Sequence, residues 1–384
     1  MLGKKLFLLK VYLYSLLNSL VLIYSLYSIA FQERGLSVAQ IGIALMFWSV
    51  SVIILQLPIG MLSDRLSRRN MMIFGNVVVS IAFFIFMRWP TFIGVMTGFA
   101  LWGLKWAIDA ACFQPMVYDQ IRDKKKYLAI VGTCESIKLV GLALSALCSF
   151  LVFLGYDFLT WCTIGIMALG AIVLATMPYD KHITRGHSVK QMGMRDIWVA
   201  MQYVFTRPAL MALVVILAIL NGGGNIDEWL GLIALELGYP EYAVGMLYFC
   251  ALISGALGGL AVRGIHNTRP MMVPTLIAGG GLMLAISTVW FNVWSTIALC
   301  LFWVLITISQ NITYADFQNS VSTAVRGRTT AVLEIAQNVG SMMIYGIMTC
   351  AQTFGGGYKY GLFAIGALLI LTSVSITLKQ HKFV

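Results

Sequence analysis

The sequence predicts an all-α polytopic membrane protein, and three observations lead to this fold class. Of the 384 residues, 60% are hydrophobic and only 11% are charged, whereas a soluble globular protein has roughly 25% charged residues. The apolar residues are gathered in runs of about 20, the length that a helix needs to cross a bilayer. Basic residues stand in small groups between these runs, which is typical of membrane-protein loops.

The apolar runs predict twelve membrane-spanning helices. In lipid, only helices and closed barrels satisfy the backbone, and barrel strands would be about ten residues long with alternating polarity. The runs in this chain are longer and continuous, so we expect helices. The predicted spans are 11–31, 38–60, 71–88, 91–117, 128–154, 158–177, 208–232, 242–262, 270–289, 294–315, 329–352 and 359–378.

The loops predict the topology and the domain organisation. The longest polar segment separates spans six and seven, which gives an N-terminal half over 1–177, a cytoplasmic central loop with an amphipathic helix over 178–207, and a C-terminal half over 208–384. With both termini in the cytoplasm, 21 basic residues face inward, three face outward and two lie within spans. Because cytoplasmic loops are enriched in Lys and Arg, this distribution supports cytoplasmic termini.

The two halves share short patterns at nearly constant separations. Offsets of 203, 197 and 199 residues relate three sets of positions: Glu33, Gly35 and Gly42 to Glu236, Gly238 and Gly245; Asp119 to Asp316; Glu135 and Gly141 to Glu334 and Gly340. Parallel six-helix repeats of this kind place a substrate site between the halves, near the middle of the membrane.

The loop after the second span carries a recognisable motif. Residues 60–70 read GMLSDRLSRRN, in which Gly60, Asp64, Arg65, Arg68 and Arg69 stand at characteristic spacings, with Ser67 where a second glycine is usual. The motif resembles the signature loop of the major facilitator superfamily, in a bacterial permease-like or exporter-like subgroup. The resemblance implies a twelve-helix fold of two six-helix pseudo-repeats in the cytoplasmic membrane, with Asp64, Arg65 and Arg68 latching the cytoplasmic side in one conformation. Alternatively, this is a solvated basic loop that only sets topology.

Charged residues within spans are costly and therefore paired or functional. Lys105 and Asp109 are four residues apart on one face of span four and can form an ion pair. Glu135 and Lys138 lie at a similar expected depth in span five. The four charges sum to zero, and we consider two interpretations: a buried network that stabilises this half, or a relay for protons or ions in the transport path.

Span seven contains the most unusual stretch of the chain, from Asn221 to Trp229. Its three consecutive glycines cost a helix roughly 3 kcal/mol relative to alanine, and interrupted helices can offer backbone groups to substrates or ions. Asn221, Asn225, Asp227 and Glu228 are therefore substrate-binding or proton-binding candidates. The alternative is that the span ends near residue 226 and both acids are solvated.

Four further polar or aromatic residues are candidates for lining a cavity, namely Asn18, Gln310, Trp102 and Trp106. The alternative for the amides is hydrogen bonding between helices. The chain shows no nucleotide-binding Gly-x4-Gly-Lys motif and no metal-ligand spacing, so we expect no cofactor, no metal and no enzymatic activity. The distribution of basic residues also argues against nucleic acid as a partner.

The leading hypothesis is secondary active transport of a small molecule by alternating access. A proton gradient is the favoured energy source, because six acids lie in or at the ends of spans. Export by antiport is favoured by the resemblance. The alternatives are a proton-coupled importer or facilitator of a small nutrient and, more remotely, a non-transporting membrane sensor or enzyme. The expected partners are the substrate, protons and the lipid bilayer, with the chain acting as a monomer.

Overall fold

A computed structural model describes residues 2–63, 65–121, 124–178, 194–265, 271–322 and 325–381. Every regular element in these ranges is helical, and they contain no strand. The prediction of an all-α fold is confirmed. Helices are expected here because a helix satisfies its own backbone hydrogen bonds without help from water.

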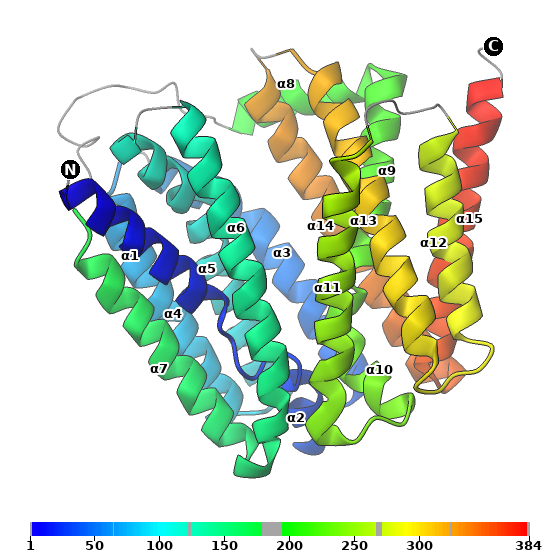
Figure 1. Cartoon of the computed structure of the whole chain (residues 1–384), viewed down its shortest axis with the longest axis horizontal. Helices are drawn as coiled ribbons and strands as arrows, with labels where there is room; N and C mark the ends of the chain where they lie inside the picture. The colour runs from blue at the N-terminus through cyan, green and yellow to red at the C-terminus, as the bar shows by residue number, and fades with distance from the viewer. Residues whose placement is uncertain are drawn as a thin grey trace. The chain divides into compact units, whose positions relative to one another are not determined.

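The chain forms two compact units. Unit 1 comprises residues 1–36 and 47–194, and unit 2 comprises residues 37–46 and 195–384. The helices up to α7 are α1 (Leu2–Ser19), α2 (Tyr27–Glu33), α3 (Val38–Ser63), α4 (Arg68–Arg88), α5 (Phe92–Ile121), α6 (Lys124–Leu147), the short 3-10 helix η1 (Cys148–Leu154) and α7 (Tyr156–Ala175). Figure 1 shows them coloured from blue to green along the chain.

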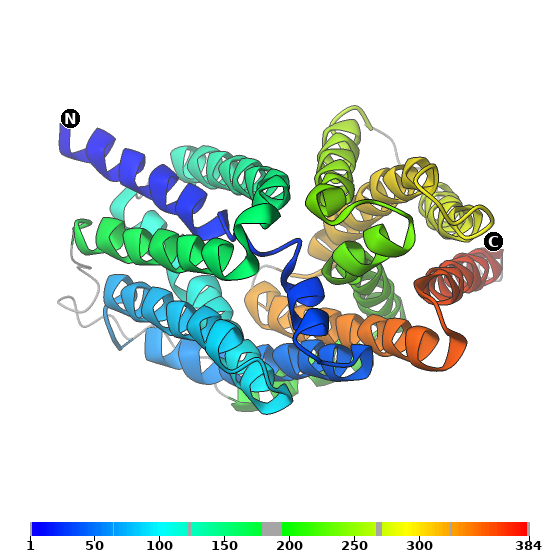
Figure 2. The same ribbon diagram turned by 90° about the horizontal axis from the view of Figure 1, so that it is seen from below.

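The later helices begin with α8, in the segment expected to hold an amphipathic helix. They are α8 (Met194–Phe205), α9 (Pro208–Gly224), the 3-10 helix η3 (Asn225–Trp229), α10 (Leu230–Glu236), the 3-10 turn η4 (Glu241–Ala243), α11 (Val244–Val262), α12 (Met272–Ser287), α13 (Ser295–Ser320), α14 (Arg326–Gly355) and α15 (Tyr358–His381). Figure 2 shows the same helices from below. The predicted boundaries near residues 177 and 208 stay a prediction.

Nine helices within the described ranges are long and apolar enough to cross a membrane. They coincide with nine of the twelve predicted spans. The other three predicted spans fall on α1 with α2, on α5, and on α12, which has 16 residues. The multi-pass membrane architecture is therefore confirmed, whereas the count of twelve stays a prediction.

The first span of unit 1 differs from the expected continuous helix over 11–31. Helix α1 ends at Ser19, and α2 begins only at Tyr27. The Ser19 hydroxyl donates to the carbonyl oxygens of Ser15 and Leu16, at 3.0 and 2.9 Å. Serine side chains that bond to the preceding turn compete with regular helix bonding, which gives a local reason for the interruption.

In the first span of unit 2 the helix changes from α to 3-10 geometry at Asn225, which we call the interruption of this span, although the helical path continues over Pro208–Glu236. The three glycines themselves are helical within α9, and the change to 3-10 geometry follows them directly. Gly222 also has a packing role, because a Cβ added to it would lie 2.5 Å from the carbonyl oxygen of Gly340 in α14. This glycine therefore permits a close crossing of α9 and α14.

A matching glycine turn follows the interrupted span in each unit. Gly35 and Gly238 have φ angles of 92° and 93°, in the left-handed region that favours glycine. After each helix the same backbone bond closes the turn: Leu36 N–H donates to Phe31 O at 3.1 Å, and Tyr239 N–H donates to Ala234 O at 3.0 Å. Both are Schellman caps, so the sequence repeat corresponds to a repeated backbone structure.

The acid before each glycine turn ties α2 or α10 to the start of the last helix of its own unit. Tyr156 at the start of α7 donates its hydroxyl to Glu33 at 3.2 Å. In unit 2, the backbone N–H of Tyr358 at the start of α15 donates to Glu236 at 2.9 Å. These equivalent contacts, together with the turns, hold the short helix after each interruption in place.

Candidate functional site

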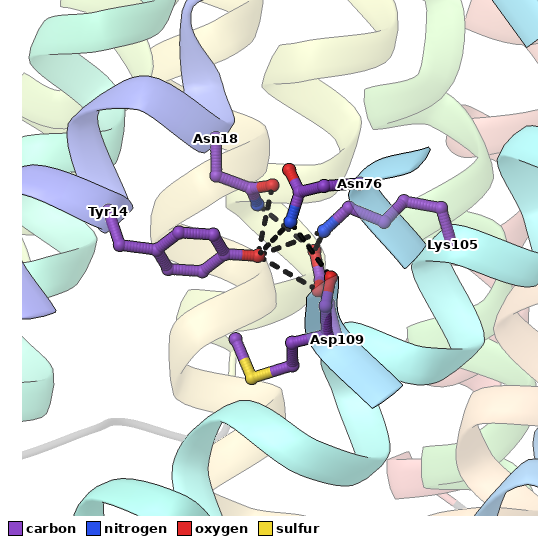
Figure 3. A network of polar contacts seen from close by, with 6 residues as sticks. Tyr14, Asn18, Asn76, Lys105 and Asp109 are labelled. Atoms are coloured by element: carbon purple, nitrogen blue, oxygen red, sulfur yellow. Dashed lines mark hydrogen bonds and ion pairs between the residues drawn. The ribbon is translucent and has the colours of Figure 1, made fainter. Parts of the chain in front are cut away.

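Five polar side chains from three helices meet inside unit 1 (Figure 3). They are Tyr14 and Asn18 from α1, Asn76 from α4, and Lys105 and Asp109 from α5. The predicted ion pair between Lys105 and Asp109 is present. Tyr14 lies at the centre of the cluster, which we call the Tyr14 cluster.

Hydrogen bonds surround both charges of the Tyr14 cluster. Lys105 Nζ donates to the Tyr14 hydroxyl at 3.0 Å, and Asn76 Nδ2 donates to the same oxygen at 3.3 Å. Asp109 accepts from Asn18 Nδ2 at 3.0 Å and from the Tyr14 hydroxyl at 3.3 Å. A buried ion pair is tolerated when further hydrogen bonds satisfy its remaining groups, and this arrangement meets that requirement.

The two charged members of the cluster differ in exposure. The Lys105 side chain is 5% exposed, whereas the Asp109 side chain is 21% exposed. Tyr14 and Asn76 are each 1% exposed. Asp109 and the half-buried Asn18 are thus the members of the cluster that are partly accessible, whereas Tyr14, Asn76 and Lys105 are enclosed.

Glu135 and Lys138 form a separate ion pair on α6, at 2.8 Å. Their side chains are 53% and 30% exposed, and Lys138 Nζ lies 5.2 Å from the centre of the Phe113 ring. The four charges predicted at similar depth are therefore found as two pairs, each within one helix. Of these two pairs, the one on α5 is closely enclosed.

The two candidate tryptophans of α5 lie in different surroundings. Trp102 stacks on Phe99 with the ring centres 6.0 Å apart and the planes inclined by 2°. It also packs against Phe83, at 5.1 Å between ring centres. Trp106 is 56% exposed and contacts Trp48 edge-on at 5.9 Å. Trp102 thus belongs to an aromatic cluster, whereas more than half of the surface of Trp106 is exposed.

In unit 2, the amides of the interrupted span bind to α14. Asn221 Nδ2 donates to Ser341 Oγ at 3.3 Å and to Gln337 O at 3.4 Å. Asn225 Nδ2 also donates to Ser341 Oγ. The two asparagines therefore fasten both sides of the α9–η3 junction to one serine. Gln310 is half-buried on α13.

Asp227 and Glu228 lie within η3, immediately after this junction. Both residues are half-buried, so they are neither fully solvated nor sealed in the core. The Oδ1 atom of Asp227 is buried and has no hydrogen-bond partner among the described residues. Burying such a group as a bare charge is costly, and a bound proton or cation would reduce that cost.

The signature loop is held by contacts to other helix ends. Asp64 lies outside the described residues, and Arg65 is exposed. Arg68 pairs with Asp119 at the end of α5, at 2.6 Å, and Arg69 donates to Met177 O at 2.9 Å. The latch that the motif implies therefore stays a prediction.

Ser67 has a structural role that explains its place in the motif. Its hydroxyl accepts a hydrogen bond from Asn70 N–H at 3.3 Å and caps the N-terminus of α4. Serine is a favoured N-cap residue, so the exchange of glycine for serine supplies a cap. Gly60 lies within α3 beside open space.

The sequence did not predict Tyr14 and Asn76 as members of the site. Asn76 stands alone in an apolar run. Tyr14 lies in an apolar run of its own, as several other tyrosines of the chain do, and nothing in the sequence sets it apart from them. The only signal was the spacing of Tyr14 and Asn18, which are four residues apart and share one face of α1.

The fold is that of a helical membrane transporter. The sequence matches the model of the Major Facilitator Superfamily over residues 9–345. The chain belongs to this superfamily and is a transporter of small molecules.

Three solved structures share the fold at low sequence identity. A mutant form of the nucleoside transporter NupG gives a TM-score of 0.80 at 12% identity, covering 97% of this chain and 99% of that chain. Another NupG structure gives 0.77 at 14% identity, covering 98% of both chains. The inward-open xylose transporter XylE from E. coli gives 0.72 at 13% identity, covering 96% of this chain and 94% of that chain. No curated protein matches the sequence.

Proposed function

We propose that the protein is a proton-coupled secondary transporter in which Asp227 carries the coupling proton. The observation behind this proposal is the buried Oδ1 atom of Asp227, which has no hydrogen-bond partner in the described chain. Lys105 and Asp109 already neutralise one another. Asp227 forms no such ion pair among the described residues, so gain or loss of a proton would change the net charge around η3.

The position of Asp227 suits this role. It lies shortly beyond Asn221 and Asn225, whose amides fasten the junction of α9 and η3 to Ser341. A change of charge at Asp227 would therefore act beside the interruption of the span. Interrupted helices carry the substrate and ion sites of many transporters, and Asn221, Asn225 and Glu228 are the proposed neighbours of the coupling site.

For the direction of transport we propose export by proton antiport across the bacterial cytoplasmic membrane, with both termini in the cytoplasm. The compact loops and the signature motif support this direction. Uptake is the second candidate, supported by the likeness of the fold to a nucleoside transporter and a xylose transporter. In either case the chain works as a monomer with two units, and Asp64, Arg65 and Arg68 form the latch.

The test begins with a thermal-shift screen of purified protein against nucleosides, pentoses and other small metabolites. Proteoliposomes containing the stabilising compound and a pH-sensitive dye then report proton movement during transport. We expect Asp227→Asn to abolish substrate-driven proton flux while exchange of labelled for unlabelled substrate continues. Asp316→Asn is the matched control, because Asp316 is an exposed acid on α13 of the same unit.

Proton flux in the Asp227→Asn protein equal to that of the wild type would refute the role of Asp227. Proton flux lost together with exchange would indicate a damaged protein or substrate site, and the Asp316→Asn control would then show whether any loss of an acid has this effect. A fixed pH gradient then decides the direction of transport. Substrate that moves against the proton flow indicates antiport and export, and substrate that moves with it indicates uptake.

A further inference from the structure

Helix α8 has one apolar face packed on unit 2. Ile197, Ala200 and Val204 recur at helical spacing and are only 4%, 2% and 1% exposed. Ala200 and Val204 belong to a core cluster with Phe317 of α13 and Leu333 of α14. This inner face accounts for the docking of α8 onto the unit.

The opposite face of α8 also carries large apolar side chains, and these are exposed. Trp198 and Phe205 are 60% and 57% exposed. They are seven residues apart, so they lie on the same side of the helix, two turns from one another. Arg195 and Gln202 occupy the same side and are exposed as well. The outer face thus combines aromatic and basic groups.

The connections of α8 place it next to the start of a candidate spanning segment. The helix ends at Phe205, and the spanning segment over Pro208–Glu236 begins three residues later. Its first turn is fixed to the start of α14 by an ion pair between Asp196 and Arg328, at 3.0 Å. Figure 1 shows α8 at the end of unit 2 where α9 begins.

A second arginine stands just after α8, between this helix and α9. Arg207 is exposed, and its guanidinium carbon lies 3.4 Å from the centre of the Tyr203 ring. The stacking keeps the charge close to the helix. Aromatic residues with a polar edge prefer the region between headgroups and acyl chains, and basic residues near it attract anionic lipids.

We propose that the outer face of α8 is a binding surface for an anionic phospholipid bilayer. Trp198 and Phe205 enter the boundary between headgroups and acyl chains, while Arg195 and Arg207 bind the lipid phosphates. Amphipathic helices that lie in the interface use this combination of buried aromatic area and basic charge. The bilayer would then set the position of α8 and, through Asp196 and Arg328, of the start of α14.

The proposal can be tested by fluorescence quenching of the full chain reconstituted in bilayers. The chain has ten tryptophans, so the signal of Trp198 is taken as the difference between the wild type and Trp198→Phe. Bilayers contain lipids brominated either near the headgroup or near the chain ends, with or without phosphatidylglycerol. Acrylamide in the buffer reports exposure to water.

We expect bromine near the headgroup to quench the Trp198 signal at least about twofold more than bromine near the chain ends, as expected for a side chain at the interface. Phosphatidylglycerol should strengthen this quenching. Arg195→Gln should raise by about fivefold the phosphatidylglycerol content that gives half of this strengthening, as expected for the loss of one basic group at an anionic surface. Arg263→Gln, which removes an exposed charge outside α8, should have no such effect.

Three outcomes would overturn the proposal. Quenching by acrylamide alone would mean that the outer face points to water. Protection from acrylamide and from both brominated lipids would mean that another part of the chain covers the face. Lipid quenching that is unaffected by phosphatidylglycerol would remove the anionic headgroup as the ligand.

Discussion

Unit 1 encloses Lys105 and Asp109 as an ion pair with hydrogen bonds on both charges, whereas unit 2 buries a carboxylate oxygen of Asp227 that has no partner in the described chain. The surrounding backbone is similar in the two units, with an interrupted first span and the same glycine turn. The difference teaches that one repeated scaffold can hold a charge paired with a counter-ion in one unit and a carboxylate without an ion-pair partner in the other. A paired charge supports the structure, and an unpaired one can respond to protons.

The largest effect should come from separating the ion pair in unit 1. Lys105→Met or Asp109→Asn alone should lower the free energy of unfolding by about 3–5 kcal/mol, because the other group is left without its partner in a buried site. The double variant should lose much less than the sum of the two single losses. Unfolding of the purified protein in denaturing detergent measures all three.

The corresponding change in unit 2, Asp227→Asn, should leave the free energy of unfolding within about 0.5 kcal/mol of the wild type, since no ion pair is lost. The contrast between the units would break down if Asp227→Asn were as damaging as Asp109→Asn. Additive losses in the Lys105–Asp109 double variant would likewise show that the two side chains do not act as a pair.

An intermediate effect is expected at the close helix crossings. A Cβ on Gly340 would collide with the carbonyl oxygen of Ala218, and one on Gly141 would collide with the hydroxyl oxygen of Ser19. Gly340→Ala and Gly141→Ala should each cost about 1–3 kcal/mol through overpacking. Thermal unfolding should show the larger loss for Gly340→Ala, because its obstacle is rigid backbone, whereas the Ser19 hydroxyl can rotate away.

The matched controls for these crossings are Gly346→Ala in α14 and Gly132→Ala in α6, where an added Cβ meets nothing within 4 Å. Both should be neutral or should stabilise by up to about 1 kcal/mol, since alanine favours the helix. If the crossing and control variants lost the same stability, close packing at the crossing would not be the reason that glycine is needed there.

The two glycine turns should respond equally. Gly35→Ala and Gly238→Ala each force a side chain into the left-handed region, and each should cost about 1–2 kcal/mol. Neither added Cβ meets an atom within 4 Å, so the cost should come from the backbone alone. Asparagine, which tolerates this conformation better, should cost less at both positions. A loss confined to one unit in thermal unfolding would argue against equivalent turns.

The smallest effect is expected for the second ion pair of unit 1. Lys138→Met separates Glu135 from its partner, but both side chains are substantially exposed. Exposed pairs contribute up to about 1 kcal/mol, so the loss should be well below that of Lys105→Met. Similar losses for the two lysines in the same unfolding assay would show that burial does not set the strength of these pairs.

The sequence predicted the features of the fold that depend on local pattern. Continuous apolar runs predicted the helices, and the spacing of Lys105 and Asp109 predicted their ion pair. The spacing of Glu33 and Gly35 recurs at Glu236 and Gly238, and it corresponds to a real structural repeat. Each of these rests on residues close together in the chain or on hydropathy.

Features that depend on distant residues could not be predicted. Asn76 joins the Tyr14 cluster only because α4 packs beside α5 and its side chain reaches Tyr14 of α1, and a lone asparagine in an apolar run does not reveal its partner. The interruption after Ser19 was missed because that stretch has no glycine or proline. Gly222 was interpreted through helix propensity alone, although its contact with Gly340 also matters.

The glycine turns at Gly35 and Gly238 are closed by main-chain atoms, and the side chains around them take little part. In a chain with two copies of one scaffold, such turns can survive extensive sequence change, because almost any neighbouring residue supplies the same N–H and C=O groups. Each copy could then acquire its own chemistry without losing its architecture. Exchanging polar residues between the two copies is therefore a practical route to redesigning what the protein carries.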